Sequence, residues 1–391
     1  MTMRDLHICL RMTASLEWIG GMVYIENLTR ALASLPENER QGVKVSISTS
    51  RGNAAFLEPI RANVDRIYYH EHNLYRAYFR IANIIAANIR FIPRWFFDPR
   101  RFDFVYPDWG GANGAYQWGG WIPDFQHYHL PEFFSQQDIN VRNALFKKMA
   151  ENATIIILSS RMAQEDFCSL YPQAASRTAV LNFVSGINPQ WFEENPAAYQ
   201  QKHELPDNFF LLANQFWKHK DHRVVIEALG LLKQQGIHPT VVCTGSTTDY
   251  RHPGYFQGLL SRIQQLDLDE QVRILGYIPR LDQVQLIRKS LAVIQPSRFE
   301  GWSTIVEEAR SLGKTILLSD FPVHLEQNPP NSYFFERGNA EELAGLMAKV
   351  LSSAGSTPNL FNEKIARQDN VARLQTMGRD FLQIVRCATG R

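Results

Sequence analysis

Short apolar segments alternate with amphipathic helical patterns along most of this chain, and this alternation restricts its fold more than any other feature. Segments that alternate in this way form βαβ units, in which parallel strands share one sheet and helices cover both faces. The first series comprises predicted strands at 6–12, 43–49, 64–70, 102–106 and 154–160, with helices at 22–35 and about 74–89. This series predicts an α/β domain with a doubly wound parallel sheet.

A second series follows a polar, proline-bearing stretch at about 188–207. It comprises strands at 209–213, 240–244, 272–275 and 291–295, separated by helices at 223–235, 255–266 and 282–290. Two such series predict two Rossmann-like domains that face a central cleft. Because ligands of these sheets bind beyond the carboxyl ends of the strands, we expect the functional residues in the loops that follow the strands.

The composition argues against several classes of protein. The 391 residues, 45% of them hydrophobic, suffice for two or three domains with full cores. A net charge of +2 does not favour a nucleic-acid-binding protein, and we expect no nucleic-acid partner. No apolar run reaches the ~18 residues of a membrane span, and we expect no signal peptide. The four cysteines are widely spaced and fit a reducing compartment, so we expect a cytoplasmic protein.

The segment 296–309, Pro-Ser-Arg-Phe-Glu-Gly-Trp-Ser-Thr-Ile-Val-Glu-Glu-Ala, connects the strand at 291–295 to a new helix. The helix is predicted to begin near Ser303 or Thr304, since either side chain can cap it. Four backbone N–H groups are then free at a helix N-terminus, where a phosphate group binds well. These N–H groups belong to Gly301, Trp302, Ser303 and Thr304.

Two carboxylates flank this turn. Glu300 approaches it from the loop, and Glu308 lies about one turn into the helix, with a side chain that leans back toward the N-terminus. Because acids repel phosphate, we interpret both as groups that bind neutral hydroxyls on either side of a diphosphate, a sugar at one end and a ribose at the other. In the alternative interpretation, both are solvated charges around an ordinary βα unit.

The spacing of Glu300 and Glu308 resembles the Glu-x7-Glu motif of the retaining GT-B glycosyltransferases of family four. The flanking sequence is similar as well, because Pro296-Ser297 precedes the first glutamate and Gly-Lys-Thr-Ile-Leu-Leu-Ser-Asp follows at 313–320. The resemblance implies that Glu308 binds the ribose hydroxyls and that Glu300 acts at the transferred sugar. It also implies a metal-independent reaction without a cofactor, in which a nucleotide diphosphate sugar is the donor substrate.

The same resemblance implies the GT-B arrangement of domains. An N-terminal acceptor-binding domain would span 1–203, and a nucleotide-sugar-binding domain would span 204–370. The segment 371–391, with an amphipathic pattern at 371–385, would form a helix that packs back on the first domain.

Lys220 is the main candidate for a cation that neutralises the donor diphosphate. It follows the strand at 209–213 and resembles a lysine of the family, whereas the arginine that the family commonly has five positions earlier is Gln215 here. Lys218 or an arginine of the first domain is expected to supply the missing charge. In the alternative interpretation, the two lysines cover a solvated loop.

Gly20 and Gly21 precede the first predicted helix and resemble the paired-glycine loop of the family, which lets the backbone approach the donor phosphate or the acceptor. Adjacent glycines before a helix also occur as simple loop residues. Arg11, at the end of the first strand, is a further candidate for the cleft.

The segment 119–135 resembles the family region that carries a His-Asp pair followed by Pro-Glu. Counting back from Pro131-Glu132, Asp124 falls on the family aspartate, and the histidine position is occupied by Pro123. His127 or His129 can instead hydrogen-bond the donor sugar or help to deprotonate the acceptor, unless each is a structural loop residue. We therefore select Asp124 and His127, with Glu300, as catalytic candidates.

Basic and aromatic residues are interleaved at 73–104. This pattern fits either a membrane interface with a lipid-linked acceptor or an amphipathic helix with its apolar face in the core. Peripheral contact with the inner face of a membrane is therefore a hypothesis. The residues are Tyr75, Arg76, Tyr78, Phe79, Arg80, Arg90, Phe91, Arg94, Trp95, Phe96, Phe97, Arg100 and Arg101.

The sequence thus predicts a retaining glycosyltransferase that moves a hexose-type sugar from a nucleotide diphosphate sugar to a hydroxyl of a glycan or lipid-linked glycan. Two alternatives stay open. The first is a nucleotide-sugar epimerase or hydrolase on the same fold, which would turn over the donor without an acceptor. The second is a non-catalytic GT-B subunit, which Gln215 and Pro123 would fit.

Overall fold

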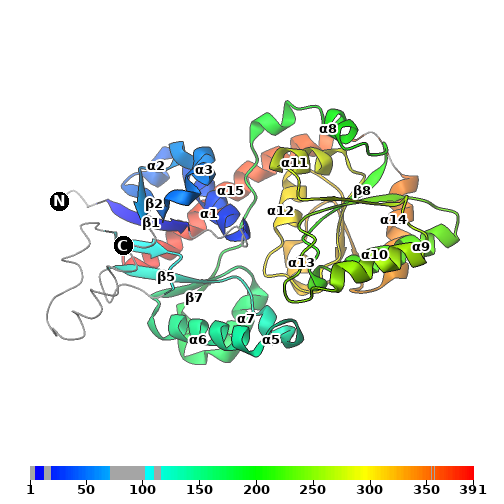
Figure 1. Cartoon of the computed structure of the whole chain (residues 1–391). Helices are drawn as coiled ribbons and strands as arrows, with labels where there is room; N and C mark the ends of the chain where they lie inside the picture. Colours follow the sequence, from blue (N-terminus) through cyan, green and yellow to red (C-terminus); the bar gives the residue numbers. More distant parts are fainter. Residues whose placement is uncertain (1–4, 13–18, 71–101, 110–115, 354, 356) are drawn as a thin grey trace. The chain divides into compact units, whose positions relative to one another are not determined.

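The computed structural model describes residues 5–12, 19–70, 102–109, 116–353, 355 and 357–391. The chain forms two compact units, each built around one parallel sheet (Figure 1). Unit 1 comprises Met1–Pro123, Asn140–Val184 and Ala372–Arg391, and unit 2 comprises Asp124–Ile139 and Ser185–Val371. The prediction of two Rossmann-like α/β domains is therefore confirmed.

The sheet of unit 1 has seven parallel strands in the order β3-β2-β1-β4-β5-β6-β7. The strands are β1 (Leu6–Met12), β2 (Val43–Ser50), β3 (Arg66–His70), β4 (Phe104–Tyr106), β5 (Gln117–Ile122), β6 (Ile155–Leu158) and β7 (Thr178–Val180). The α-helices in this part of the chain are α1 (Ile19–Ala33), α2 (Glu37–Arg40), α3 (Ala54–Leu57), α5 (Gln126–His129), α6 (Gln136–Asn152) and α7 (Arg161–Leu170). The predicted helix at about 74–89 and the basic and aromatic residues around it lie outside the described residues.

The sheet of unit 2 has six parallel strands in the order β10-β9-β8-β11-β12-β13. The strands are β8 (Phe209–Ala213), β9 (Thr240–Thr244), β10 (Val272–Gly276), β11 (Val293–Gln295), β12 (Ile316–Ser319) and β13 (Ser332–Phe335). The α-helices are α8 (Pro196–Lys202), α9 (His222–Gln234), α10 (Tyr255–Gln265), α11 (Arg280–Lys289), α12 (Thr304–Ser311), α13 (Pro322–Gln327) and α14 (Ala340–Ser352). Strand order reverses between β8 and β11, and such a switch point is where ligands of doubly wound sheets bind.

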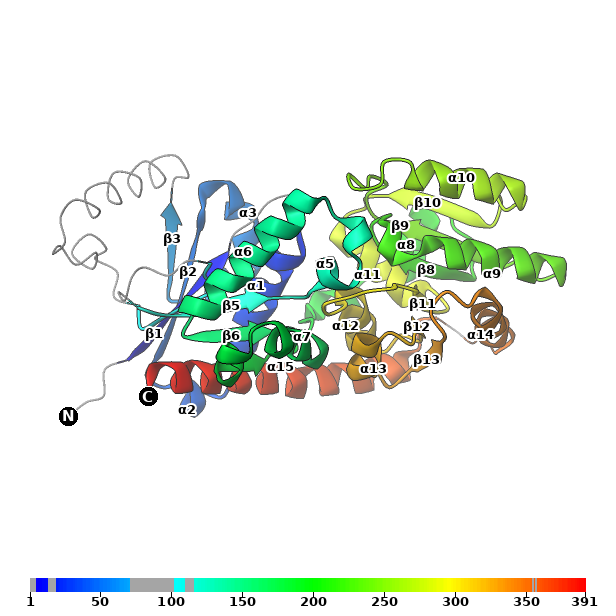
Figure 2. The same cartoon turned by 90° about the horizontal axis from the view of Figure 1, so that it is seen from below.

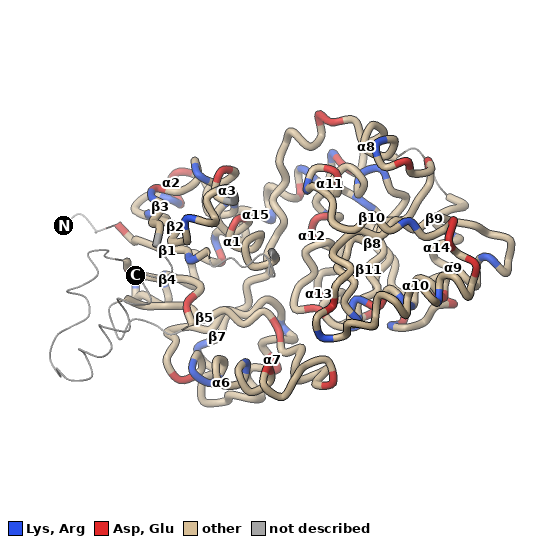
Figure 3. The backbone as a smooth tube through the Cα atoms, in the orientation of Figure 1, with Lys and Arg blue, Asp and Glu red and all other residues tan. Residues whose placement is uncertain are grey.

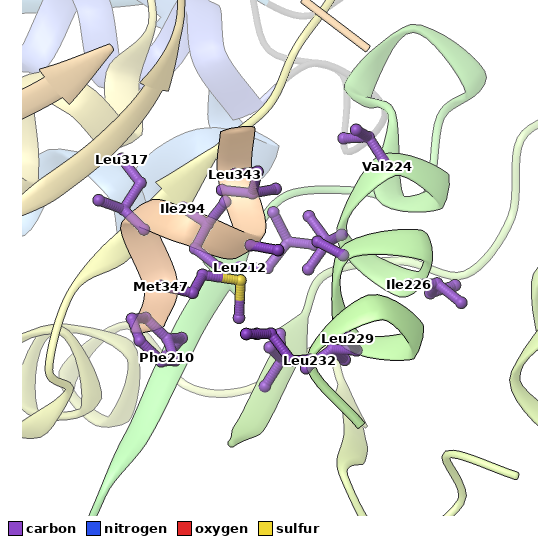
Figure 4. Close-up of a cluster of buried hydrophobic side chains, with 14 of the residues drawn as sticks. Phe210, Leu212, Val224, Ile226, Leu229, Leu232, Ile294, Leu317, Leu343 and Met347 are labelled. Atoms are coloured by element: carbon purple, nitrogen blue, oxygen red, sulfur yellow. The ribbon is translucent and has the colours of Figure 1, made fainter. Parts of the chain in front are cut away.

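Alternate residues of β8 pack on opposite faces of the sheet of unit 2. Phe210 and Leu212 face α9, α10 and α14, in the cluster shown in Figure 4. Phe209 and Leu211 belong to a second cluster, formed with α11 and α12. A strand that is buried on both faces reads as a continuous apolar run, which explains why the sequence identified β8 with its observed bounds.

The last helix, α15 (Leu360–Thr389), is a single helix of 30 residues (Figure 2). It extends well beyond the predicted 371–385. Its residues from Ala372 onward belong to unit 1, where the Phe381 ring lies 5.3 Å from that of Tyr106. Gly378 packs against the backbone of Ala31 in α1, because a Cβ at Gly378 would lie 2.6 Å from the Ala31 carbonyl oxygen.

The boundaries of the units differ from the predicted 1–203 and 204–370. Ser185 and the residues after it already belong to unit 2, as does Asp124–Ile139, which the prediction assigned to the N-terminal domain. The second segment is held in unit 2 by Arg251, whose Nη1 donates to Gln126 Oε1 at 3.3 Å and whose guanidinium lies 4.9 Å from the Phe134 ring. Periodicity does not reveal these contacts, because it reports which face of an element is apolar and not what covers it.

The structure also shows how charged residues are distributed and whether any described helix is apolar enough to cross a membrane. Acidic and basic residues are interspersed along the elements instead of being separated by sign (Figure 3). Among the described residues, no helix combines the length and the apolar character that a membrane crossing requires.

Candidate functional site

The turn between β11 and α12 lies at the carboxyl edge of the sheet of unit 2, next to the switch point. Helix α12 begins at Thr304, and Ser303 occupies the N-cap position. The Ser303 side chain does not cap the helix as predicted, because its Oγ accepts a hydrogen bond from Gln295 Nε2 at 2.9 Å. The tertiary partner at the end of β11 therefore replaces the local cap.

The backbone N–H groups of this turn are only partly free. The Ser303 N–H donates to Gln327 Oε1 at 3.3 Å, so it is not available as predicted. Those of Gly301 and Thr304 have no hydrogen-bond partner within the described parts of the chain. Two N–H groups beside a helix N-terminus still provide a place for an anion.

Glu300 is buried, with 8% of its surface exposed, and its two oxygens differ. Oε1 accepts hydrogen bonds from Lys220 Nζ at 2.6 Å and from Gln295 Nε2 at 2.7 Å. Oε2 has no hydrogen-bond partner among the described residues. Glu300 is thus not a solvated charge but a fixed carboxylate with one open acceptor.

Lys220 reaches Glu300 across 80 residues of sequence. It ends a short 3-10 helix, η7 (Lys218–Lys220), and its N–H donates to the Trp217 carbonyl at 2.8 Å. The Lys220 side chain is 17% exposed, which is too buried for a residue that merely covers a solvated loop. Lys218 is exposed, with Nζ 5.1 Å from the Phe133 ring, and Gln215 is half-buried.

Glu308 lies on the other side of the turn and is 5% exposed. Its Oε2 accepts from Arg280 Nη1 at 2.7 Å and, at 3.5 Å, from Gln283 Nε2. Arg280 begins α11, and its side chain is 43% exposed. The sequence analysis missed this arginine, although its place at the start of the helix after β10 was a usable signal.

Two buried histidines, His324 and His219, lie near the charges of Glu300 and Lys220. His324 Nδ1 lies 3.0 Å from Ser319 Oγ and 3.1 Å from the Ser319 carbonyl oxygen. Burial lowers the pKa of His324 to about 4, against the opposing effect of the Glu300 charge. Burial, together with the nearby Lys220 and Arg251, also lowers the pKa of His219 well below its ordinary value. Both rings are therefore neutral at neutral pH.

Asp124 and His127 both belong to unit 2. The Asp124 carboxylate accepts from the Gln126 N–H at 2.9 Å, and His127 is buried. Within the described parts of the chain, the side-chain hydrogen bonds of Glu300, Lys220 and Glu308 involve neither residue. His129 contacts the segment that carries Glu300, because its ring lies 5.4 Å from the ring of Phe299.

The paired glycines belong to unit 1. Gly20 and Gly21 lie in the first turn of α1 and not in a loop before it, which corrects the predicted helix start at residue 22. Gly20 is exposed and Gly21 is buried. Arg11, at the end of β1, forms an ion pair with Asp108 at 2.7 Å.

Gln295 is a functional candidate that the sequence analysis missed. It is fully buried at the end of β11 and contacts both Glu300 and Ser303. One signal was available, because it is the only polar residue of the apolar segment 291–295 and directly precedes the Pro-Ser of the motif. Buried amides are kept in a core when they are fully hydrogen-bonded.

Comparison with known proteins identifies a family domain in the second half of the chain. Residues 195–368 match the family model described as "Glycosyl transferases group 1". No curated protein sequence matches the chain significantly.

Several solved structures have a similar fold over nearly the whole chain. HepE from Anabaena in complex with UDP is 18% identical, with a TM-score of 0.62 over 97% of this chain and 99% of that chain. A glycosyltransferase from Rickettsia africae is 17% identical, with a TM-score of 0.65 over 98% of each chain. Sucrose-phosphate synthase from Thermosynechococcus elongatus is 16% identical, with a TM-score of 0.61 over 97% of this chain and 96% of that chain. The chain thus has the GT-B fold, and its residues 195–368 match the glycosyl transferases group 1 domain.

Proposed function

We propose that this protein is a glycosyltransferase that moves a hexose-type sugar from a nucleoside diphosphate sugar to an acceptor hydroxyl. The observation that carries the proposal is the buried Lys220–Glu300 pair beside the N-terminal turn of α12. The pair, the turn and Glu308 all lie within the residues that match the glycosyl transferases group 1 model.

The diphosphate would bind at the turn. The N–H groups of Gly301 and Thr304 are available to its oxygens, and a lysine ammonium has three hydrogens, of which Glu300 uses one for Lys220. Negative charge develops on the diphosphate when the bond to the sugar breaks. Donors that are already in place stabilise this charge without reorganisation, which lowers the barrier to transfer.

The hydroxyls would bind to the two glutamates. The open Oε2 of Glu300 can accept from a hydroxyl of the transferred sugar, while Lys220 links this carboxylate to the diphosphate. Glu308 would accept from the ribose hydroxyls. Since Arg280 already occupies Glu308 Oε2, the ribose would use the other oxygen or displace the exposed arginine.

The finer parts of the proposal come from the resemblance and from the relatives. Structures of HepE were solved with UDP and with UDP-glucose, so we propose a UDP-sugar as the first donor to test. Retention of configuration, metal independence, and a glycan or lipid-linked glycan as acceptor are parts of the same proposal. So are the catalytic roles of Asp124 and His127 and a peripheral contact with a membrane.

A thermal-shift screen against UDP, GDP, ADP, CMP and dTDP tests the nucleotide site. A nucleotide at ~100-fold over its dissociation constant should raise the free energy of unfolding by roughly 2.7 kcal/mol. We expect one nucleotide to stabilise the wild type, and Lys220→Met and Glu308→Ala to lose most of that stabilisation.

Lys233→Ala is the matched control, because Lys233 forms an ion pair with Asp267 at 2.6 Å at the opposite end of α9 from the Lys220 loop. This variant should keep the full nucleotide effect. Absence of stabilisation by every nucleotide would contradict the proposal and favour a non-catalytic subunit. Turnover of the donor without an acceptor, at the same rate as with one, would favour a hydrolase or an epimerase.

A further inference from the structure

We propose that Gln295 is a positioning residue that fixes which oxygen of Glu300 is offered to the sugar. This inference rests on the proposed function and deepens it. Gln295 is the last residue of β11, one of the two central strands at the switch point, and its side chain is fully buried.

The Gln295 amide is hydrogen-bonded at both ends. Its Oε1 accepts from Asn214 Nδ2 at 2.5 Å, at the end of β8. Its Nε2 lies 2.7 Å from Glu300 Oε1 and 2.9 Å from Ser303 Oγ, with Ser297 Oγ as a third, more distant acceptor at 3.2 Å. One side chain therefore connects the loop after β8, the Glu300 loop and the N-cap of α12.

The orientation of this amide is fixed by chemistry. A carboxylate only accepts hydrogen bonds, so the NH2 group of Gln295 must face Glu300. The Asn214 amide then donates to the remaining oxygen of Gln295. If the Gln295 amide were rotated by a half turn, its oxygen would face Glu300 Oε1 and its NH2 group would face the Asn214 NH2 group. Two buried polar groups would then lack a hydrogen bond, and this cost disfavours the rotated amide.

The consequence is an unequal pair of oxygens on Glu300. Gln295 and Lys220 together occupy Oε1, and Oε2 is left as the acceptor. Hydrogen bonds of charged groups are strong in a buried site, so the carboxylate cannot rotate without losing both. The sugar hydroxyl thus meets a carboxylate oxygen that is already in place. Gln295 should therefore matter more for the sugar part of the donor than for its nucleotide part.

Calorimetric titration with UDP and with UDP-glucose tests this inference. The ratio of the two affinities isolates the contribution of the sugar. Because hydrogen bonds to charged groups contribute about 1.5–3 kcal/mol, Gln295→Leu should reduce that ratio by about tenfold or more. The affinity for UDP itself should change much less.

Gln295→Glu adds a pH profile that a purely structural role would not produce. Once it carries a proton, the new carboxyl can donate to Glu300 Oε1 and still accept from Asn214. When that proton is lost at higher pH, two carboxylates face each other and the orientation of Glu300 is no longer held. The sugar contribution in Gln295→Glu should therefore fall as the pH rises, while in the wild type it should stay constant over the same range.

Gln285→Leu is the matched control. Gln285 is an equally buried amide of α11, and its hydrogen bonds go to the Trp191 carbonyl and to Arg288 instead of to Glu300 or Ser303. This variant should lose stability but keep the wild-type ratio of affinities. If the wild type binds neither UDP nor UDP-glucose, the proposed UDP-sugar function fails and this inference fails with it. If the wild type binds both and Gln295→Leu keeps the ratio, only the inference is overturned.

Discussion

At the scale of single residues, unit 2 contains several buried histidines, among them His222 and His324. His222 is the first residue of α9, is 2% exposed and stacks on Phe216 with a centroid distance of 4.2 Å. Burial lowers its pKa to about 3, and burial likewise lowers the pKa of His324 to about 4. Each of these rings binds a proton more weakly in the folded protein than in the unfolded chain.

This difference predicts that the protein loses stability in acid. An unfolded histidine has a pKa of about 6.5, so below that pH the unfolded state binds more protons and the free energy of unfolding falls as the pH falls. The loss begins near pH 6.5 and continues down to the folded pKa values of about 3 for His222 and about 4 for His324. Above pH 6.5 these groups contribute no pH dependence.

His222→Leu isolates one contribution. At pH 5 the wild type should have lost about 2 kcal/mol through His222 alone, and the variant should lack that loss. Urea unfolding at pH 7.5 and pH 5 measures both. Equal acid sensitivity of the wild type and the variant would show that His222 takes up its proton in the folded state.

At the scale of elements, close packing of α15 on α1 depends on one glycine. Glycine in a helix interior costs roughly 1 kcal/mol relative to alanine, so local propensity favours Gly378→Ala. The Cβ of that alanine would lie 2.6 Å from the Ala31 carbonyl oxygen and 3.0 Å from its carbon. Backbone cannot give way as a flexible side chain does, and overpacking typically costs 1–3 kcal/mol. We therefore expect the free-energy cost of overpacking to exceed the gain in helix propensity.

We expect Gly378→Ala to lower the free energy of unfolding by up to about 2 kcal/mol net. Gly345→Ala in α14 is the matched control, because a Cβ there meets no atom within 4 Å. That variant should raise the free energy of unfolding by up to about 1 kcal/mol. Chemical denaturation of both variants gives the comparison, and a stabilised Gly378→Ala would mean that α15 moves away from α1 without cost.

At the scale of the whole molecule, each unit collects its core from distant parts of the chain. Unit 1 takes in Ala372–Arg391 at the end of the sequence, and Phe381 of this segment is fully buried beside Phe104 and Tyr106. Unit 2 contains Lys220, Glu300 and Glu308. Stability of the first core and ligand binding by the second unit should therefore be separable.

Phe381→Ala tests this separation. Removing a buried phenylalanine side chain costs about 3–5 kcal/mol, and we expect the loss to be confined to unit 1. Hydrogen exchange followed by mass spectrometry should show faster exchange in β1 and β4, while nucleotide protection around the α12 turn persists. Leu360→Ala, at a 69% exposed position of the same helix, should change neither. Loss of nucleotide protection in Phe381→Ala would show that the two units fold as one.

The sequence by itself determined the fold class and the main motif. Strands β1, β8 and β9 have the predicted bounds, because continuous apolar runs between turn residues need no tertiary information to be recognised. The Glu300 to Glu308 segment was readable for the same reason, since a strand, a glycine turn and a helix start are all local signals.

Strand β5 was not predicted, although it lies inside the sheet of unit 1. It carries Gly119 and Gly120, which weaken strand propensity. A Cβ at Gly119 would lie 2.8 Å from the Tyr106 ring, and one at Gly120 would lie 3.2 Å from Ile156. Only glycine fits at these positions, because side chains that are distant in the sequence pack against its backbone. Local propensity therefore disfavoured a strand at a place where the tertiary packing forms one.

Only the tertiary structure decided which residues of the site are joined by ion pairs and hydrogen bonds. The pairing of Lys220 with Glu300, of Arg280 with Glu308 and of Asn214 with Gln295 joins the ends of different strands at one edge of a sheet. A hydrogen bond depends on the distance between two atoms, and strand order sets that distance for residues far apart in the chain. The sequence therefore determined which residue types are present at the turn, and the folded sheet decided which of their atoms are already bound and which remain open.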